Sequence, residues 1–403
     1  MTRLTRHTHT VRAASIGYIV QSTINTFAPL LFVTFQTDYH LTLMQVSLLI
    51  ALNFGAQILL DLAASLLADR IGYRRCMVTA HFLAALGLAG LALFPGLFPT
   101  PFAGLAAAVV IYGAGGGLTE VLLTPVVQAC PIREKEKAVS MLHSFYCWGS
   151  VLVILLSTLF FHTAGLQNWK VLALLWALLP VANGIYFLLV PIYDLVPEGE
   201  RTPARRLAGS GVFWLLLLFM FCAGACEMGV AQWASNFVEE GLRVSKTVGD
   251  LAGPCLFAAL KGAERLWYGK RGERVPLWGF MLACAGLCAV CYLALGLTVS
   301  PAAGLTACAL AGFSTGVMWP GTFALAARAL PRGGTALYGM LALFGDLGCG
   351  AGPAITGAVS AACGGSLHAG FLFGTSFACL MILGLLILRR TGRVAPPSGS
   401  VSA

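Results

Sequence analysis

Three acidic residues stand inside long apolar segments of this sequence, where a charged side chain is out of place. Glu120, Glu227 and Asp346 each lie several residues from either end of their segment. A carboxylate in hydrocarbon costs roughly 2.5 kcal/mol or more, so it persists where it faces a cavity or a partner. Burial also raises the pKa of a carboxyl group, which lets the group bind and release a proton near neutral pH. The three residues are therefore predicted to couple function to protons, and a permanent ion pair is the structural alternative for each.

Glu227 shares its segment with two amides that stand on another helix face. Gln232 and Asn236 are four residues apart and share a face, whereas Glu227 points about 140° away from Gln232 and about 180° away from Asn236 on an ideal helix. All three side chains can line one cavity only if the helix breaks. Gly229 is the candidate for that break.

Asp346 has a second interpretation, as half of an ion pair. Lys261 and Arg265 stand four residues apart in another apolar segment, with Glu264 between them. The two segments are expected to be neighbours, so Asp346 could pair with Lys261 in a buried network of alternating charge. We favour a structural or gating role for Lys261, Arg265 and Asp346 over direct substrate contact.

Amide, imidazole and aromatic side chains at similar depth suggest a ligand with hydroxyl groups and apolar faces. Rings stack on the apolar faces of such a ligand, and amides hydrogen-bond its hydroxyl groups. The same aromatic residues are also ordinary packing and interfacial anchors in membrane helices, which is the competing interpretation. The candidate substrate-binding residues are Gln21, Asn25, His143, Tyr146, Gln232, Trp233, Asn236 and Trp319.

The segments that carry these residues are predicted to span a membrane. Hydrophobic residues make up 58% of the 403 residues and charged residues only 10%, where a soluble domain carries about a quarter. A span needs about 20 apolar residues to cross the hydrocarbon core. Twelve all-α spans are expected, at residues 13–36, 44–67, 76–95, 102–128, 138–162, 170–192, 211–236, 247–268, 277–298, 302–328, 334–360 and 368–388.

Landmarks of the first half of the chain recur 200 positions later. Gly72 corresponds to Gly272, and Pro131 corresponds to Pro331. Two six-helix halves built on one plan predict a membrane transporter with its site between them. The expected organisation is an N-terminal six-helix bundle (1–192), a polar cytoplasmic linker (193–210), a C-terminal six-helix bundle (211–390) and a disordered tail (391–403).

The basic residues predict the orientation of the chain in the membrane. With both termini inside, twenty Lys and Arg residues fall in cytoplasmic segments, and only Lys170, Arg243 and Lys246 fall on the other side. This asymmetry follows the positive-inside rule and predicts a multi-pass protein of a bacterial inner membrane with both termini cytoplasmic. It also accounts for the net charge of +9 without a nucleic-acid partner. The first apolar stretch is long and lacks an obvious cleavage site, so it is not expected to be a removable signal.

Neither the cysteines nor any catalytic motif suggests an enzyme. The thirteen cysteines are an odd number scattered through the spans, which argues against a disulfide framework. Cys222 with Cys226, and Cys284 with Cys288, have helical spacing but no His or carboxylate to complete a metal site, so packing roles are expected. The sequence has no zinc-protease, nucleophile-elbow or phosphate-loop motif. We therefore expect no enzymatic activity, no metal and no cofactor.

The junction of the second and third segments carries a recognisable order of residues. Residues 68–75 read Ala-Asp-Arg-Ile-Gly-Tyr-Arg-Arg and follow Ser65. This order resembles the signature loop of the major facilitator superfamily, with Ser65 in place of the first Gly of the pattern. The resemblance implies that superfamily's twelve-helix fold in two pseudo-symmetric halves. A gating role is expected for Asp69, Arg70, Arg74 and Arg75 as a latch between halves, the alternative being that they only anchor the topology.

Within the superfamily, the chain is similar to the fucose:proton symporter group. Residues 115–125 read Gly-Gly-Gly-Leu-Thr-Glu-Val-Leu-Leu-Thr-Pro, close to that group's glycine-rich run, buried Glu and Asn-Pro, with Thr124 in place of the Asn. The fifth span opens with His143-Ser144-Phe145, similar to the aromatic residue and Asn or His with which that group's fifth span begins. The first span offers Asn25 and Thr26 where the fucose carrier has Asn-Asp, which leaves the identity of the solute open.

The resemblance implies a monomeric secondary transporter in the lipid bilayer, with a small polar solute and H+ as its partners. A sugar or sugar-like metabolite is favoured, and Glu120 matches the acid in the group's fourth span. Spans one, four, seven and ten line the pathway in this superfamily. The remaining alternatives are an exporter of drugs or metabolites and a non-transporting membrane sensor.

Overall fold

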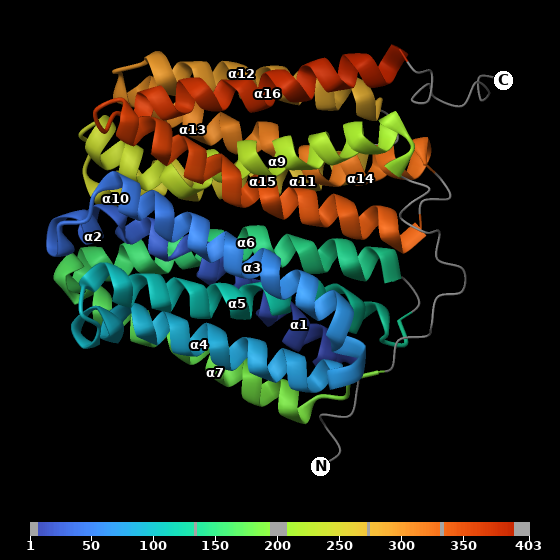
Figure 1. The fold of residues 1–403 in the computed structure, drawn as a ribbon, viewed down its shortest axis with the longest axis horizontal. Coiled ribbons are helices and arrows are strands. Elements are labelled where there is room, and N and C mark those ends of the chain that lie inside the picture. The colour runs from blue at the N-terminus through green and yellow to red at the C-terminus, as the bar shows by residue number, and fades with distance from the viewer. Residues whose placement is uncertain (1–6, 133–134, 194–207, 272–274, 331–333, 391–403) are drawn as a thin grey trace.

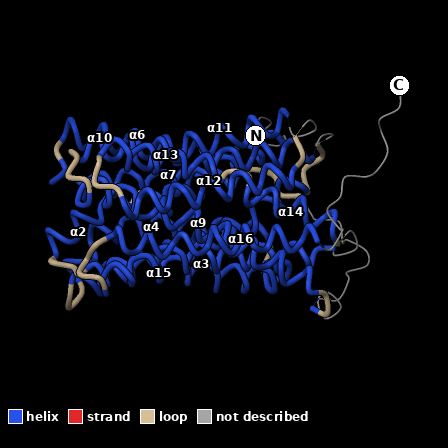
Figure 2. Tube along the Cα trace, turned by 90° about the horizontal axis from the view of Figure 1, so that it is seen from above, coloured by secondary structure: helices blue, strands red, loops and turns tan. Residues whose placement is uncertain are grey.

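The computed structural model describes residues 7–132, 135–193, 208–271, 275–330 and 334–390. Within these ranges the regular structure is entirely helical, and the connecting loops gather at two ends of the bundle (Figure 2). The predicted tail and nearly all of the predicted linker lie outside the described residues. So do the side chains of Asp69 and Arg70.

Six helical runs form the N-terminal half, as expected for apolar segments that must satisfy their backbone groups internally in lipid. The first run is α1 (His7–Thr26), η1 (Ala28–Leu31) and α2 (Phe32–Tyr39). The others are α3 (Leu43–Ile71), α4 (Tyr73–Leu97), α5 (Pro101–Gln128), α6 (Lys135–Ala164), and η2 (Leu166–Asn168) followed by α7 (Trp169–Leu189).

Six more runs form the C-terminal half. The first is α9 (Gly211–Asn236) with η3 (Phe237–Gly241), and the second joins α10 (Lys246–Asp250), η4 (Leu251–Cys255) and α11 (Leu256–Arg271). The third is α12 (Leu277–Leu297), and the fourth is α13 (Pro301–Thr315) with α14 (Met318–Ala329). The last two are α15 (Gly334–Ala362) and α16 (Leu367–Arg390). Among the described residues, ten runs are long and apolar enough to cross a membrane. The run that ends in α11 and the helix α15 lie where the remaining two spans are predicted.

The two halves lie side by side, with the N-terminal half in blue and green and the C-terminal half in yellow to red (Figure 1). Across the boundary, α3 packs against α15 and α6 packs against α11. The helix α1 begins, and α16 ends, at one end of the bundle, which we call the termini end. The opposite end is called the far end.

Close packing of α9 on α15 depends on a residue without a side chain. A Cβ atom on Gly348 would lie 2.0 Å from the carbonyl oxygen of Phe221. Small residues at such crossings let membrane helices approach closely. The backbones of α9 and α15 therefore touch at this point.

Three of the spans are interrupted along their length. The first contains the short 3₁₀ helix η1 with Pro29, the eighth contains the π-helical turn η4 with Pro254, and the tenth is broken at Gly316 between α13 and α14. By contrast, α9 continues unbroken through Gly229. The predicted break at Gly229 is therefore wrong, because the seventh span keeps its helical hydrogen bonds there and turns π-helical only at Phe237.

Candidate functional site

A network of amide side chains occupies the centre of the N-terminal half. Gln21 Nε2 donates hydrogen bonds to Gln57 Oε1 (2.8 Å) and to Glu120 Oε2 (3.0 Å). Gln57 Nε2 donates in turn to Asn25 Oδ1 (3.0 Å) and to Asn53 Oδ1 (3.1 Å). These bonds join α1, α3 and α5 and connect the Glu120 carboxylate to Asn25 through amides alone.

Asn25 stands where this network reaches the C-terminal half. Its Nδ2 group lies 3.4 Å from the hydroxyl of Tyr146 on α6, and its backbone carbonyl accepts a hydrogen bond from Gln232 Nε2 (2.8 Å) on α9. Asn25, Tyr146 and Gln232, all predicted as substrate-binding residues, are thus brought together at the boundary between the halves.

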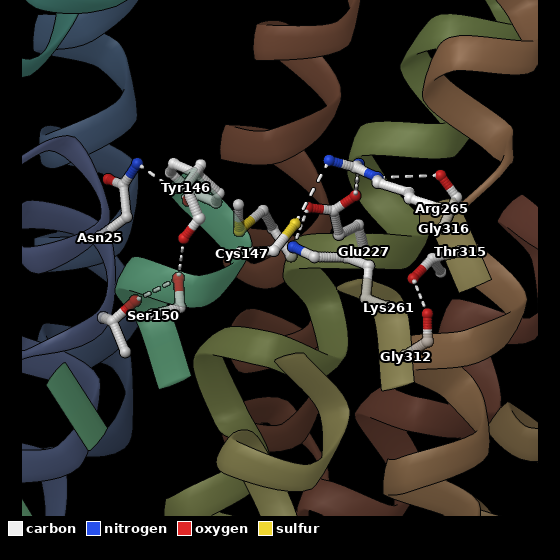
Figure 3. Close-up of polar contacts among 12 residues, drawn as sticks. Asn25, Tyr146, Cys147, Ser150, Glu227, Lys261, Arg265, Gly312, Thr315 and Gly316 are labelled. Atoms are coloured by element: carbon white, nitrogen blue, oxygen red, sulfur yellow. Dashed lines mark hydrogen bonds and ion pairs between the residues drawn. The ribbon is translucent and has the colours of Figure 1, made fainter. Parts of the chain in front are cut away.

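A cluster of charged side chains lies opposite Asn25, in the C-terminal half (Figure 3). Glu227 sits between two cations: Lys261 Nζ is 2.8 Å from its Oε1, and Arg265 Nη2 is 3.5 Å from its Oε2. The Lys261 and Glu227 side chains are only 4% and 8% exposed. The expected pairing of Lys261 with Asp346 is therefore wrong, because the carboxylate that α9 presents to Lys261 is Glu227.

Other contacts fix the two cations of this cluster. Arg265 Nε donates to the carbonyl of Gly316 (3.1 Å), at the break of the tenth span, and Arg265 Nη1 lies 3.5 Å from Cys147 Sγ on α6. The ammonium group of Lys261 lies 5.3 Å from the ring centre of Tyr146, a cation–π contact across the boundary. Both cations of this cluster thereby contact α6 of the N-terminal half.

A small cavity lies between the halves at this level. It has a volume of about 30 Å³, room for about two water molecules. Its polar lining comes from Asn25, Thr26, Tyr146, Ser150, Gln232 and Lys261, and its apolar lining includes Met228 and Phe257. Small-molecule sites usually measure about 300 to 1,000 Å³. A solute of ordinary size therefore does not fit this cavity unless the surrounding side chains or the halves move.

Asp346 belongs to α15, in the same half as Lys261, but acidic groups of the N-terminal half surround it. Asp61 on α3 and Glu120 on α5 are acidic groups within electrostatic reach of it. Asp61 was not among the predicted residues, although it is an acidic residue inside the second apolar segment and meets the same criterion as Glu120. Asp61 lies within electrostatic reach of Glu120 as well.

Three expected substrate-binding residues lie away from the cavity. Trp233 is fully buried, donates its ring N–H to the carbonyl of Pro353 (2.9 Å) and packs on Phe32. Asn236 is buried one helical turn further toward the far end. Trp319 on α14 lies against Gly345, next to Asp346.

His143 is exposed and lies on the termini side of the cavity. Its ring is 5.1 Å from that of Tyr18, and its Nε2 atom is 3.3 Å from the hydroxyl of Thr124. These contacts place His143 among α1, α5 and α6, beyond Tyr146 on the way to the termini end.

The far end of the bundle is closed by contacts between the halves. Lys246 donates a hydrogen bond to the carbonyl of Leu30 and lies 3.3 Å from Asp250 Oδ2. Ser47 donates to the carbonyl of Ala354 (2.9 Å). Neither Lys246 nor Asp250 was singled out by the sequence analysis, since both stand near a predicted span end.

The signature loop is described only in part. Arg74 donates to the carbonyls of Phe187 (2.8 Å) and Leu188 (2.7 Å), where α7 ends. These carbonyls lack helical partners, and a cation beside them also complements the helix dipole. Arg74 thus ties α4 to α7 within one half, and Arg75 is exposed.

A comparison of the sequence with known protein families agrees with this helical fold. The family model described as Major Facilitator Superfamily matches residues 14–353, most of the chain. The chain belongs to the major facilitator superfamily. No curated protein sequence matches this facilitator.

Several solved transporters share the fold of this facilitator. It is 15% identical to a D-xylose–proton symporter (TM-score 0.74, covering 96% of this chain and 98% of that one). It is 12% identical to the nucleoside transporter NupG (TM-score 0.75, covering 95% and 99%). It is 15% identical to the fucose:proton symporter of E. coli (TM-score 0.65, covering 94% and 98%). At these identities the likeness concerns the fold alone.

Proposed function

We propose that the protein is a secondary active transporter that moves a small polar solute, a sugar or sugar-like metabolite, together with protons. It works by alternating access, as a monomer in a bacterial inner membrane with both termini in the cytoplasm. The D-xylose and fucose symporters that share its fold support this class of function.

One observation carries the proposal: Glu120 is linked through Gln21 and Gln57 to Asn25, a residue of the cavity wall. A carboxyl group in this position can bind a proton, and each change in its protonation changes which hydrogen bonds its neighbours make. Solute binding at Asn25 and proton binding at Glu120 therefore act on one connected set of amides. Such a connection is what symport requires, because each ligand must alter the affinity for the other.

The cavity wall suits a solute with several hydroxyl groups. Asn25, Gln232 and Ser150 offer neutral donors and acceptors, and Tyr146 offers a ring. The positive charge of Lys261 is compensated by Glu227 at 2.8 Å, so the wall does not demand an anionic solute. A neutral polyol-like ligand satisfies these groups without leaving a charge unpaired.

A ligand screen followed by flux measurements tests the proposal. Purified protein is screened against sugars, nucleosides and polyols by thermal stabilisation, because a ligand that binds the folded state stabilises it by mass action. The ligands found are then tested in proteoliposomes, with and without a pH gradient. We expect accumulation driven by acid on the side of the solute and abolished by a protonophore. Binding without counterflow would instead indicate the non-transporting sensor.

The exporter alternative rests on the apolar part of the wall. Met228 and Phe257 face the cavity and suit a more hydrophobic ligand. An exporter that exchanges its solute for protons is driven by acid on the side opposite the solute. The same proteoliposomes with the gradient reversed therefore separate the two functions.

A further inference from the structure

Glu264 on α11 is a buried acid without a hydrogen-bond donor among the described residues. It is 0% exposed, and neither oxygen of its carboxyl group accepts a hydrogen bond there. A buried carboxyl group in this position is unfavourable unless a nearby charge or a proton compensates it. The charged groups around Glu264 therefore decide what it can do.

The side chains of Glu264 and Arg265 converge on Gly316, where the tenth span breaks. A Cβ atom on Gly316 would lie 3.0 Å from the carboxyl carbon of Glu264 and closer still to its Oε2 atom. Arg265 Nε donates to the carbonyl of the same glycine (3.1 Å). Successive residues of a helix do not face each other, so it is the close approach of Gly316 that gives the two side chains a common neighbour.

The buried charges around Gly316 balance in number but not in placement. Glu227 and Glu264 are two acids, and Lys261 and Arg265 are two cations. Both cations contact Glu227, Lys261 at 2.8 Å and Arg265 at 3.5 Å. Arg265 therefore has the longer contact with Glu227 and lies within electrostatic reach of an acid that has no donor. The same four groups allow a second arrangement, with Arg265 on Glu264.

The other elements around Glu227 do not change this balance. Tyr146 on α6, Glu120 on α5 and Cys349 on α15 are within electrostatic reach of Glu227, and none of the three is a cation. A proton on Glu227 removes the charge that attracts Lys261 and Arg265. Glu264 is then the acid left beside Arg265.

We propose that Glu264 is a positioning residue that takes over Arg265 when Glu227 is neutralised. The inference rests on the proposed proton-coupled transport for the step in which the Glu227 carboxylate binds a proton. Arg265 also holds the Gly316 carbonyl between α13 and α14, so its move to Glu264 alters the bond at the break of the tenth span. The exchange thus links the charge of Glu227 to the shape of that span.

A double-mutant cycle tests the exchange without any transport measurement. Glu227→Gln keeps the shape of a protonated Glu227 and carries no charge. In this background Arg265 depends on Glu264, whereas in the wild type it has Glu227. The effect of Glu264→Gln on the equilibrium constant of unfolding should therefore be at least about tenfold larger in the Glu227→Gln background than in the wild type.

Two further backgrounds make the cycle specific. Glu240→Gln, the same chemical change at an exposed position, should have equal effects in the wild type and in Glu227→Gln. In the double variant Glu227→Gln with Lys261→Met, Arg265 and Glu264 are the remaining cation and acid of the cluster, and the tenfold difference should persist. This double variant also carries the test if Glu227→Gln alone does not fold.

Equal effects of Glu264→Gln in the wild type and in Glu227→Gln would overturn the inference, because a merely structural role costs the same in both. A difference that disappears with Lys261→Met would also overturn it, since Lys261 would then be the partner of Glu264. Failure of the proposed function is distinguishable. In that case the proteoliposomes show no proton-driven flux of any solute, yet the difference between the two backgrounds remains.

Discussion

Replacing Glu227 by Gln should destabilise the protein far more than its small change in shape suggests. Glu227 pairs with two cations, Lys261 at 2.8 Å and Arg265 at 3.5 Å, in a place where its side chain is 8% exposed. Gln keeps the volume of the side chain but not its charge. The variant therefore leaves two buried cations without an anionic partner from α9.

The expected loss follows from the burial of this cluster. Removing one partner of a buried ion pair costs about 3 to 5 kcal/mol, because an uncompensated charge remains. An exposed carboxylate contributes about 0 to 1 kcal/mol, so Glu240→Gln is the matched control. Lys261→Met should cost less than Glu227→Gln, since Glu227 keeps Arg265 as a partner. The double variant Glu227→Gln with Lys261→Met should recover part of the loss.

Reversible unfolding in mixed detergent micelles, followed by circular dichroism, measures these differences. The ordering of the variants is the critical result. Two outcomes would show that these charges do not stabilise one another. In the first, Glu227→Gln and Glu240→Gln lower the free energy of unfolding equally. In the second, the double variant loses more free energy of unfolding than the two single variants lose together.

Two further predictions concern the packing and the closure of the bundle. Gly348→Ala places a Cβ atom 2.0 Å from the Phe221 carbonyl and should cost about 1 to 3 kcal/mol in the same unfolding assay, whereas Gly339→Ala, with nothing within 4 Å, should be near neutral; equal effects would refute the close contact of α9 with α15. Lys246→Met removes charge-assisted bonds to the Leu30 carbonyl and Asp250, worth about 1.5 to 3 kcal/mol each. The distance between spin labels on the exposed Cys363 and on Phe98→Cys, which stand at the far end on the two halves, should therefore shift toward the open state by more than tenfold in population. Exposed Lys170→Met is the control, and an unchanged distance would show that Lys246 does not close the far end.

The sequence predicts the fold well because the bilayer imposes a simple pattern on it. Apolar segments of span length mark where helices must run, and the helical runs among the described residues are consistent with the twelve expected. Interruptions are harder to predict. The tenth span breaks at Gly316, whose carbonyl accepts a hydrogen bond from Arg265, and the π-helical turn at Leu251–Cys255 contains Pro254. Gly229, by contrast, keeps a regular helix although glycine permits a break.

Site residues could be predicted by type but not by partner. An acidic residue in an apolar segment identifies Glu120, Glu227 and Asp346 as unusual, and the same signal was available for Asp61. Which cation meets which anion depends on the rotation of each helix about its axis and on its depth. The sequence does not specify either quantity, so Lys261 was paired with the wrong carboxylate.

The most direct test of the proposed transport mechanism is the effect of Glu120→Gln on accumulation against a gradient. Glu120 accepts a hydrogen bond from Gln21 Nε2 at 3.0 Å, and a Gln side chain keeps the shape of this group but cannot alternate between charged and neutral forms. In proteoliposomes with acid outside, we expect Glu120→Gln to bind and exchange solute but no longer to concentrate it, while Glu240→Gln concentrates it as the wild type does. A Glu120→Gln variant that still accumulates solute in response to external acid would contradict the account and place the coupling proton elsewhere.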